Sequence, residues 1–280
     1  MRIKKTSIIL SLISILLLLL ITIIVGNILN RGKKEVKIAK DFIEELYDND
    51  IIEKSEKLEN EMIKEEVLNK ESNRNSKIKY SVIVGKYAVD IDKDYNILGF
   101  SNKNISEIRF RSREITEDDA INLAKSFLAK MTEEDFKFKE VRNQEGIDSP
   151  VYNIVFYKYR NGYPYYYQEI NTIINKNTGK LEGYSNYPIT DIKYIEEINV
   201  TEVEATSIVK DNFKKLELDV MITEEPMLSY VNISDKEIVL AYVFNIGINS
   251  ESTKENCVSL VRADTGEIIN YNLETVAIKQ

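Results

Sequence analysis

The chain of 280 residues contains no histidine and only one cysteine, Cys257. Without histidine it cannot build a Ser-His-Asp or Cys-His catalytic site, nor the usual ligand sets for zinc. A single cysteine allows neither an intramolecular disulfide nor a thiolate metal site, and its strand-like neighbours predict that Cys257 is a small core residue. Stability must therefore come from a hydrophobic core, and hydrophobic residues make up 43% of the chain.

Glycine is scarce as well, and the ten glycines are scattered without a phosphate-binding loop. Residues 90–96 superficially match the start of a calcium loop, but Tyr95 and Ser101 replace the loop glycine and the bidentate glutamate. This segment is predicted to be a hairpin turn. Neighbouring carboxylates such as Glu117 and Asp118 fit a helix cap better than a glycosidase pair. A Ser-Lys dyad stays open, although no Ser-x-x-Lys stands in a persuasive setting. We expect no catalytic residue, no cofactor and no metal.

Basic residues are fewer than acidic residues. The chain has 38 lysine and arginine residues, 46 aspartate and glutamate residues, and a net charge of −8. Nucleic acids and anionic lipid surfaces attract proteins through a net basic face. We therefore expect neither of them to be a main partner. The balance is compatible with a soluble domain in a wall-associated space.

Ser7 to Leu29 form a nearly uninterrupted apolar run without a charge. A helix of this length spans roughly 34 Å, enough to cross a bilayer core of about 30 Å. No good Ala-x-Ala cleavage site follows, which favours an uncleaved signal anchor. Basic residues flank both ends, so the positive-inside rule gives nearly a tie. A short basic start before a long apolar run is the usual export signal, and it favours a single-pass membrane protein with an extracytoplasmic carboxy-terminal part.

The rest of the chain indicates a unit that occurs three times. Residues 115–120 and 200–205 read as similar helix starts, and Ala120 and Ala205 lie 85 positions apart. Two similar turns follow, whose glycines, Gly179 and Gly266, lie 87 positions apart. Two landmarks at nearly one offset indicate internal repetition. A segment around residue 39 aligns with one around residue 124, which suggests a degenerate first copy.

Each copy is predicted to be one helix followed by an antiparallel meander. Apolar residues at helical spacing predict a helix over 36–47, and Thr116 is a candidate N-cap for a second helix. Alternating apolar residues predict strands, and Asn161 with Gly162 is a strong hairpin signal between 151–160 and 163–174. A third hairpin is expected around 246–255, and residues 48–77 are predicted to form a charged, solvated segment. Residues 99–102 and 183–186 are closely similar.

The predicted fold class is therefore α+β, an N-terminal transmembrane helix followed by tandem helix-plus-antiparallel-sheet units, because a helix stripe and a sheet face bury each other. The predicted segments are 1–30, a cytoplasmic start and signal anchor; 31–110, a linker and degenerate first repeat; and two further repeats at 111–190 and 191–280.

Residues 115–124 resemble the helix opening of PepSY domains. Residues 159–163 and 173–181 resemble the hairpin of these domains, especially of the YcdB/YcdC-type repeat. The segment 261–268 is similar but weaker. The resemblance implies PepSY-like units in a family that is typically extracytoplasmic and non-enzymatic, associated with inhibiting peptidases or steering cell-wall hydrolases. An anchored chain with tandem units is also similar to spore-germination accessory proteins.

Aromatic residues gather around the Asn161–Gly162 turn. Alternation on two paired strands places several tyrosines on one face, and tyrosine is enriched in binding hot spots. Ordinary cross-strand packing and core lining remain the alternative. The candidate partner surface consists of Tyr157, Tyr159, Arg160, Tyr163, Tyr165 and Tyr167.

The sequence thus predicts a membrane-anchored, extracytoplasmic regulatory protein that binds a peptidase or a cell-wall hydrolase without catalysis. A first alternative is an accessory regulator of a membrane sensor kinase, contacted through the span from Ser7 to Leu29 and the ectodomain. An enzyme of unseen type and a structural spacer are the remaining alternatives.

Overall fold

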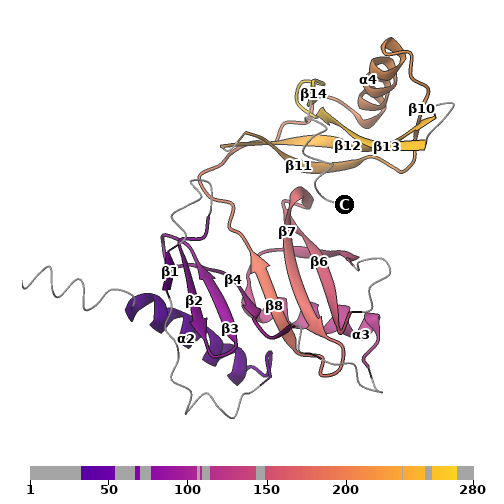
Figure 1. The fold of residues 1–280 in the computed structure, drawn as a ribbon. Coiled ribbons are helices and arrows are strands. Elements are labelled where there is room, and N and C mark those ends of the chain that lie inside the picture. The colour runs from indigo at the N-terminus through magenta and orange to yellow at the C-terminus, as the bar shows by residue number, and fades with distance from the viewer. Residues whose placement is uncertain are drawn as a thin grey trace, which may run out of the picture. The chain divides into compact units, whose positions relative to one another are not determined.

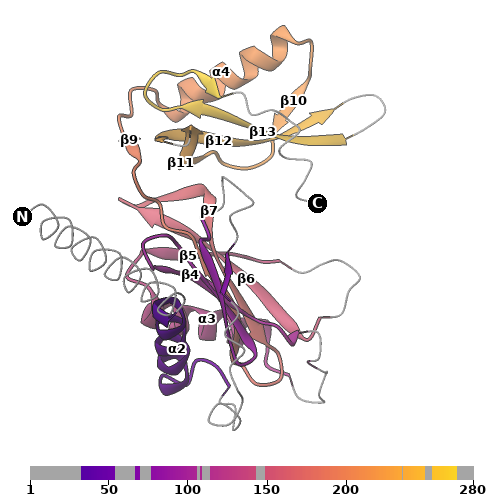
Figure 2. The ribbon, with the colours of Figure 1, turned by 60° about the vertical axis from the view of Figure 1, so that its left-hand side comes forward.

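The structure is a computed structural model that describes residues 33–53, 67–69, 77–105, 108, 114–142, 149–234, 236–249 and 254–269. The described parts form two compact units (Figures 1 and 2): one from Met1–Ser112 with Lys180–Ser185, the other from Arg113–Gly179 with Asn186–Gln280. The predicted span from Ser7 to Leu29 lies outside the described residues. Among the residues that are described, no helix has the length and apolar character needed to cross a membrane.

The first unit packs one helix against an antiparallel meander. Its elements are α2 (Lys33–Asp48), β1 (Val67–Asn69), β2 (Tyr80–Val84), β3 (Tyr87–Ile91), β4 (Ile97–Asn102) and β8 (Leu181–Asn186). The first four strands pair in sequence order, each antiparallel to the next. Helix α2 buries Ala39, Ile43 and Leu46 at helical spacing, and its Phe42 ring meets the Phe100 ring of β4 edge-on at 5.8 Å. The predicted helix over 36–47 is confirmed.

The two similar segments, 99–102 and 183–186, turn out to pair with each other. Strand β4 is antiparallel to β8, with Gly99 opposite Ser185, Phe100 opposite Tyr184 and Ser101 opposite Gly183. The backbones approach so closely that a Cβ atom on Gly99 would lie 2.2 Å from the Tyr184 carbonyl oxygen. The glycine is therefore required by the approach of the β8 backbone.

The turn between β3 and β4 confirms the hairpin predicted at residues 90–96. The Asp92 carboxylate accepts hydrogen bonds from the backbone N–H groups of Asp94 and Asn96, both at 2.8 Å. Tyr95 has a φ of 70° and stacks on Tyr80 at 5.9 Å. Asp92 therefore caps the backbone of its own turn, as an Asx turn does.

The second unit contains two helices and the remaining strands. Its elements are α3 (Glu117–Met131), β5 (Phe136–Val141), β6 (Val151–Arg160), β7 (Tyr163–Asn175), β9 (Lys193–Ile195), α4 (Glu202–Lys215), β10 (Val220–Ile222), β11 (Met227–Ser234), β12 (Glu237–Asn249), β13 (Lys254–Arg262) and β14 (Ile268–Ile269). Strands β5, β6 and β7 form one antiparallel series. Strands β11, β12, β13 and β14 form another, and β10 also pairs with β12. The third hairpin, expected around 246–255, is formed by β12 and β13, whose antiparallel pairing ends with Asn249 opposite Lys254.

Both helices of this unit begin in the same way. Thr116 and Thr201 are N-caps of capping boxes, in which each hydroxyl accepts the backbone N–H of the residue three positions later. The partners are Asp119 and Glu204, at 3.1 and 3.3 Å. The acidic residues after each cap are therefore explained by local helix chemistry.

A similar turn that contains a glycine packs against each of these two helices. Gly179 and Gly266 have φ values of +68° and +76°, where glycine is favoured. A Cβ atom would lie 2.9 Å from the side chain of Leu123 in the first case and 3.1 Å from that of Ile208 in the second. The predicted landmark glycines thus lie where a turn packs onto a helix.

We expect Gly179→Ala and Gly266→Ala each to lower the free energy of unfolding by about 2 kcal/mol, from backbone strain together with overlap against the helix. Urea unfolding followed by circular dichroism measures the loss. Gly162→Ala is the matched control, because its φ is +86° but no atom lies within 4 Å of the added Cβ. An equal loss in all three variants would show that contact with the helix contributes nothing.

The predicted fold class, a transmembrane helix followed by tandem α+β units with purely antiparallel sheets, is wrong. Most of the described elements are strands of a mixed sheet: β11 pairs parallel with β7, and β12 pairs parallel with β9. The parallel pairing of β9 has a physical reason. Strand β12 extends beyond the part that pairs with β13, which covers residues 241–249. The segment before α4 supplies β9, which pairs with β12 at residues 237–239.

Candidate functional site

The predicted hairpin around Asn161 and Gly162 is confirmed. These residues have φ values of 49° and 86°, as a two-residue turn between twisted strands requires. The turn joins β6 to β7, and Arg160 pairs with Tyr163 beside it. The register shifts between Tyr157 and Tyr159, which changes how the side chains alternate near the tip.

The six predicted surface residues do not share one surface. Tyr165 is only 5% exposed, and its ring lies 5.0 Å from that of Tyr230 on β11. Tyr163 meets the same Tyr230 ring at 6.3 Å and packs against the core of the β11–β14 sheet. Burial raises the pKa of Tyr165, so its hydroxyl stays protonated. Tyr163 and Tyr165 are therefore packing residues.

Two of the predicted tyrosines, Tyr157 and Tyr159 on β6, lie beside two lysines of β5. Lys137 lies 4.4 Å from the centre of the Tyr159 ring, and Lys139 lies 4.8 Å from that of Tyr157. Tyr167 is 38% exposed. We call Tyr157, Tyr159, Lys137 and Lys139 the tyrosine–lysine face, and Tyr167, whose ring contact is with Tyr166, is not included in it. The ammonium groups of the two lysines in this face therefore already lie against aromatic rings in the absence of a partner.

An ion-pair network borders the tyrosine–lysine face. Glu169, opposite Tyr157 in the β6–β7 register, pairs with Lys139 and with Arg142, whose Nη2 lies 3.2 Å from the carboxylate. Burial alone would raise the pKa of Glu169, but the hydrogen bonds from Lys139 and Arg142 outweigh it and lower that pKa. Glu169 therefore stays ionised and holds the lysine in place.

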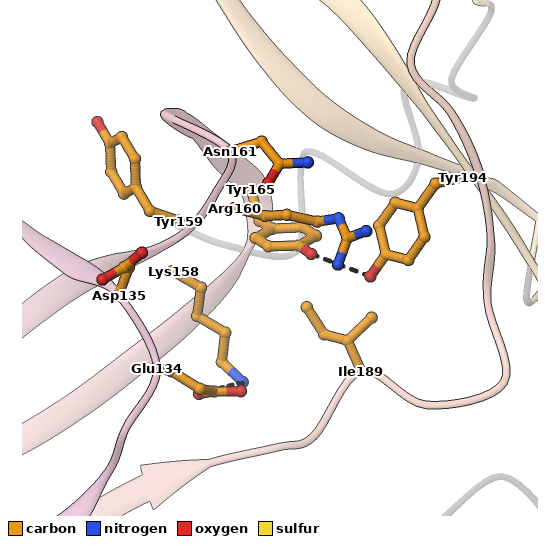
Figure 3. Close-up of a pocket in the computed structure, with 9 residues that line it drawn as sticks. All are labelled: Glu134, Asp135, Lys158, Tyr159, Arg160, Asn161, Tyr165, Ile189 and Tyr194. Atoms are coloured by element: carbon orange, nitrogen blue, oxygen red, sulfur yellow. Dashed lines mark hydrogen bonds and ion pairs between the residues drawn. The ribbon is translucent and has the colours of Figure 1, made fainter.

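Arg160, the sixth predicted residue, lines a pocket of about 340 Å³ in the second unit (Figure 3). Its Nε donates to the Glu196 carboxylate at 3.1 Å, and its guanidinium lies 4.2 Å from the centre of the Tyr194 ring on β9. Glu196 also accepts from the Tyr230 hydroxyl at 2.7 Å. The hydrogen bond from Tyr230, together with Arg160, lowers the pKa of Glu196. The pocket is lined by Glu134, Asp135, Lys158, Tyr159, Arg160, Asn161, Tyr165, Ile189 and Tyr194.

Lys158 is a pocket residue that the sequence analysis missed. Its side chain is 2% exposed, and its ammonium group donates to the Tyr187 carbonyl at 2.6 Å and pairs with Glu134 at 3.2 Å. Its burial could have been predicted from its position two residues after Phe156. Side chains alternate along a strand, so both residues lie on the side of β6 that faces the core. Tyr194 and Glu196 gave no such signal, because they precede the helix start at 200–205 and belong to none of the predicted helices and strands.

The remaining candidate groups have structural settings. Cys257 is partly buried and packs against the core of the β11–β14 sheet. Within the described ranges, no group of three or more cysteine, aspartate or glutamate side chains is arranged to hold a metal ion.

No protein-family model matches the sequence, and no curated protein matches it. Among solved structures, the chain is similar to the Bacillus megaterium YpeB C-terminal domain, with 18% sequence identity and a TM-score of 0.44. The similarity covers 78% of this chain and 97% of the YpeB domain.

Proposed function

We propose that this chain is a PepSY-type, extracytoplasmic regulatory protein that binds a peptidase or a cell-wall hydrolase without catalysis. The observation that carries the proposal is the tyrosine–lysine face. It offers large aromatic contact areas with cations already oriented, the composition that recurs at binding hot spots. Membrane anchoring through Ser7 to Leu29 stays a prediction from the sequence.

The face also has the charge balance of a specific protein interface. Lys139 is paired with Glu169, and Arg142 with Glu140 at 2.6 Å. A partner that covers this face meets alternating charges rather than a field of one sign, which favours a defined orientation over general attraction. Such a face suits recognition of one folded protein.

Photocrosslinking in cells tests the proposal. A photoreactive amino acid at Lys137, an exposed member of the face, is expected to give an adduct with a peptidase or wall hydrolase, identified by mass spectrometry. The same amino acid at Tyr165, which is 5% exposed, is the control and is expected to give none. An adduct with a sensor kinase would replace the proposal with the signalling alternative. The absence of any adduct specific to Lys137 would contradict a partner at this face.

A further inference from the structure

The pocket beside the hairpin shares Tyr159 with the tyrosine–lysine face, and its other lining residues lie outside that face. It lies within the second unit, and its walls come from the turn after α3, from β6 and its turn, from β7, and from the segment through β9 (Figure 3). Its volume of about 340 Å³ lies at the lower end of the range for small-ligand sites. It can take a peptide end of two or three residues.

The guanidinium of Arg160 is fixed on two sides. The Glu196 carboxylate accepts from Nε. The centre of the Tyr194 ring lies 4.2 Å from the guanidinium, and Figure 3 shows this ring beside Arg160. Among the described residues, neither terminal nitrogen, Nη1 or Nη2, has an acceptor. A planar fork with two free donor nitrogens matches a carboxylate in bidentate geometry. Because the protein already orients the fork, little side-chain entropy remains to be lost when a ligand binds.

A second donor lies beside the guanidinium. The hydroxyls of Tyr165 and Tyr194 are 2.9 Å apart and share one hydrogen bond, so one of the two O–H hydrogens remains available. Burial keeps the pKa of Tyr165 raised, and the pair therefore remains a donor rather than an anion at neutral pH. Lys158 adds a buried positive charge to the lining.

The acidic residues of the lining restrict the kind of anion. Glu134 and Asp135 lie on the other side of Lys158 from Tyr194 (Figure 3). A phosphate group would carry two charges toward these carboxylates. A peptide end carries one charge, and its amide N–H groups are donors that carboxylates accept. Ile189 and the tyrosine rings supply apolar surface for a small side chain.

We propose that this pocket binds the free α-carboxylate of a peptide C-terminus, with Arg160 as its bidentate partner and the Tyr165–Tyr194 hydroxyl pair as the second donor. The amide groups of the bound peptide face Glu134 and Asp135. This site goes beyond the proposed function, because it names a ligand chemistry and does not depend on the partner of the tyrosine–lysine face.

The test is calorimetric titration of the purified full-length chain with three acetylated tripeptides. The first is trialanine with a free carboxylate, the second is the same peptide amidated, and the third carries its only carboxylate on a central glutamate and is amidated. The free carboxylate is expected to bind at least about tenfold more tightly than either amide, the difference that one good charged pair makes.

Variants of the pocket residues test which side chains bind the carboxylate. Arg160→Gln is expected to weaken binding of the free tripeptide about tenfold or more, and Tyr194→Phe to weaken it a few-fold. Lys193→Gln is the control: this lysine adjoins Tyr194 but lies outside the pocket lining, is 72% exposed, and is expected to leave the affinity unchanged. Far-ultraviolet circular dichroism shows that each variant is folded.

Four results would overturn the proposal. They are no binding of the free tripeptide up to about 10 mM, equal binding of the amidated form, tighter binding of the glutamate peptide, and unchanged affinity in Arg160→Gln. No partner protein is present in the titration. Its outcome therefore does not affect the crosslinking test of the proposed function.

Discussion

We expect the Tyr230→Ala variant to lose about 3–5 kcal/mol of its free energy of unfolding, as for other large aromatic truncations in a core. Tyr230 is 1% exposed, and its ring contacts three other tyrosines. The centroid distances are 6.3 Å to Tyr163, 5.0 Å to Tyr165 and 5.7 Å to Tyr194. Removing the ring opens a cavity among residues of β7, β9 and β11, at the position where β11 pairs with β7.

Urea unfolding followed by circular dichroism measures this loss. Tyr230→Phe is the matched control, because it keeps the ring and removes only the hydrogen bond to Glu196 at 2.7 Å. Glu196 keeps its bonds to Arg160 and Asn161, so the control is expected to lose about 1 kcal/mol. Equal losses in the two variants would mean that the hydroxyl, not the ring, stabilises this junction.

The second large effect is expected for Gly99→Ala, which we predict to lower the free energy of unfolding by about 3 kcal/mol. The added Cβ atom would lie 2.2 Å from the Tyr184 carbonyl oxygen and 3.0 Å from the Ser185 Cα atom. Both are backbone atoms of β8, so no rotation of a side chain relieves the overlap. The two strands must separate, and their hydrogen bonds lengthen.

Urea unfolding measures the loss, and amide hydrogen exchange in β4 and β8 shows whether the paired strands open. The control is Ser101→Ala, two positions along the same strand, whose exposed side chain becomes smaller. It is expected to change stability by less than about 0.5 kcal/mol. Similar values for the two variants, with unchanged exchange, would contradict the close approach at Gly99.

The correctly predicted parts of the structure are those whose chemistry is local in the chain. The capping threonines Thr116 and Thr201 satisfy helix N–H groups within three residues, and Asn161 with Gly162 supplies the backbone conformation of its own turn. The turn centred on Asp92 is of the same kind. Such signals act over a few residues and can therefore be read directly from the sequence.

The incorrectly predicted fold class depended on pairing between distant residues. Strand β9 has only three residues, and its single tyrosine gave no periodic pattern. Its position is determined by the part of β12 that β13 does not cover, which only the folded sheet defines. In the same way, Tyr165 is buried by Tyr230, which is 65 positions away. Alternation placed several tyrosines on one face, but the register shift between Tyr157 and Tyr159 and the parallel pairing with β11 separate Tyr165 from them.

The pairing of β4 with β8 has a consequence for assembly. Two nearly identical segments lie antiparallel with Phe100 opposite Tyr184, so each contributes the same surface, as the subunits of an isologous dimer do. Here both halves belong to one polypeptide, and they meet at the high effective concentration of an intramolecular contact. Each segment also covers an edge of the other that could otherwise recruit a strand from a neighbouring molecule. A self-complementary strand edge is a source of aggregation when it is exposed on separate chains. Because both similar segments belong to one chain here, their contact does not depend on protein concentration.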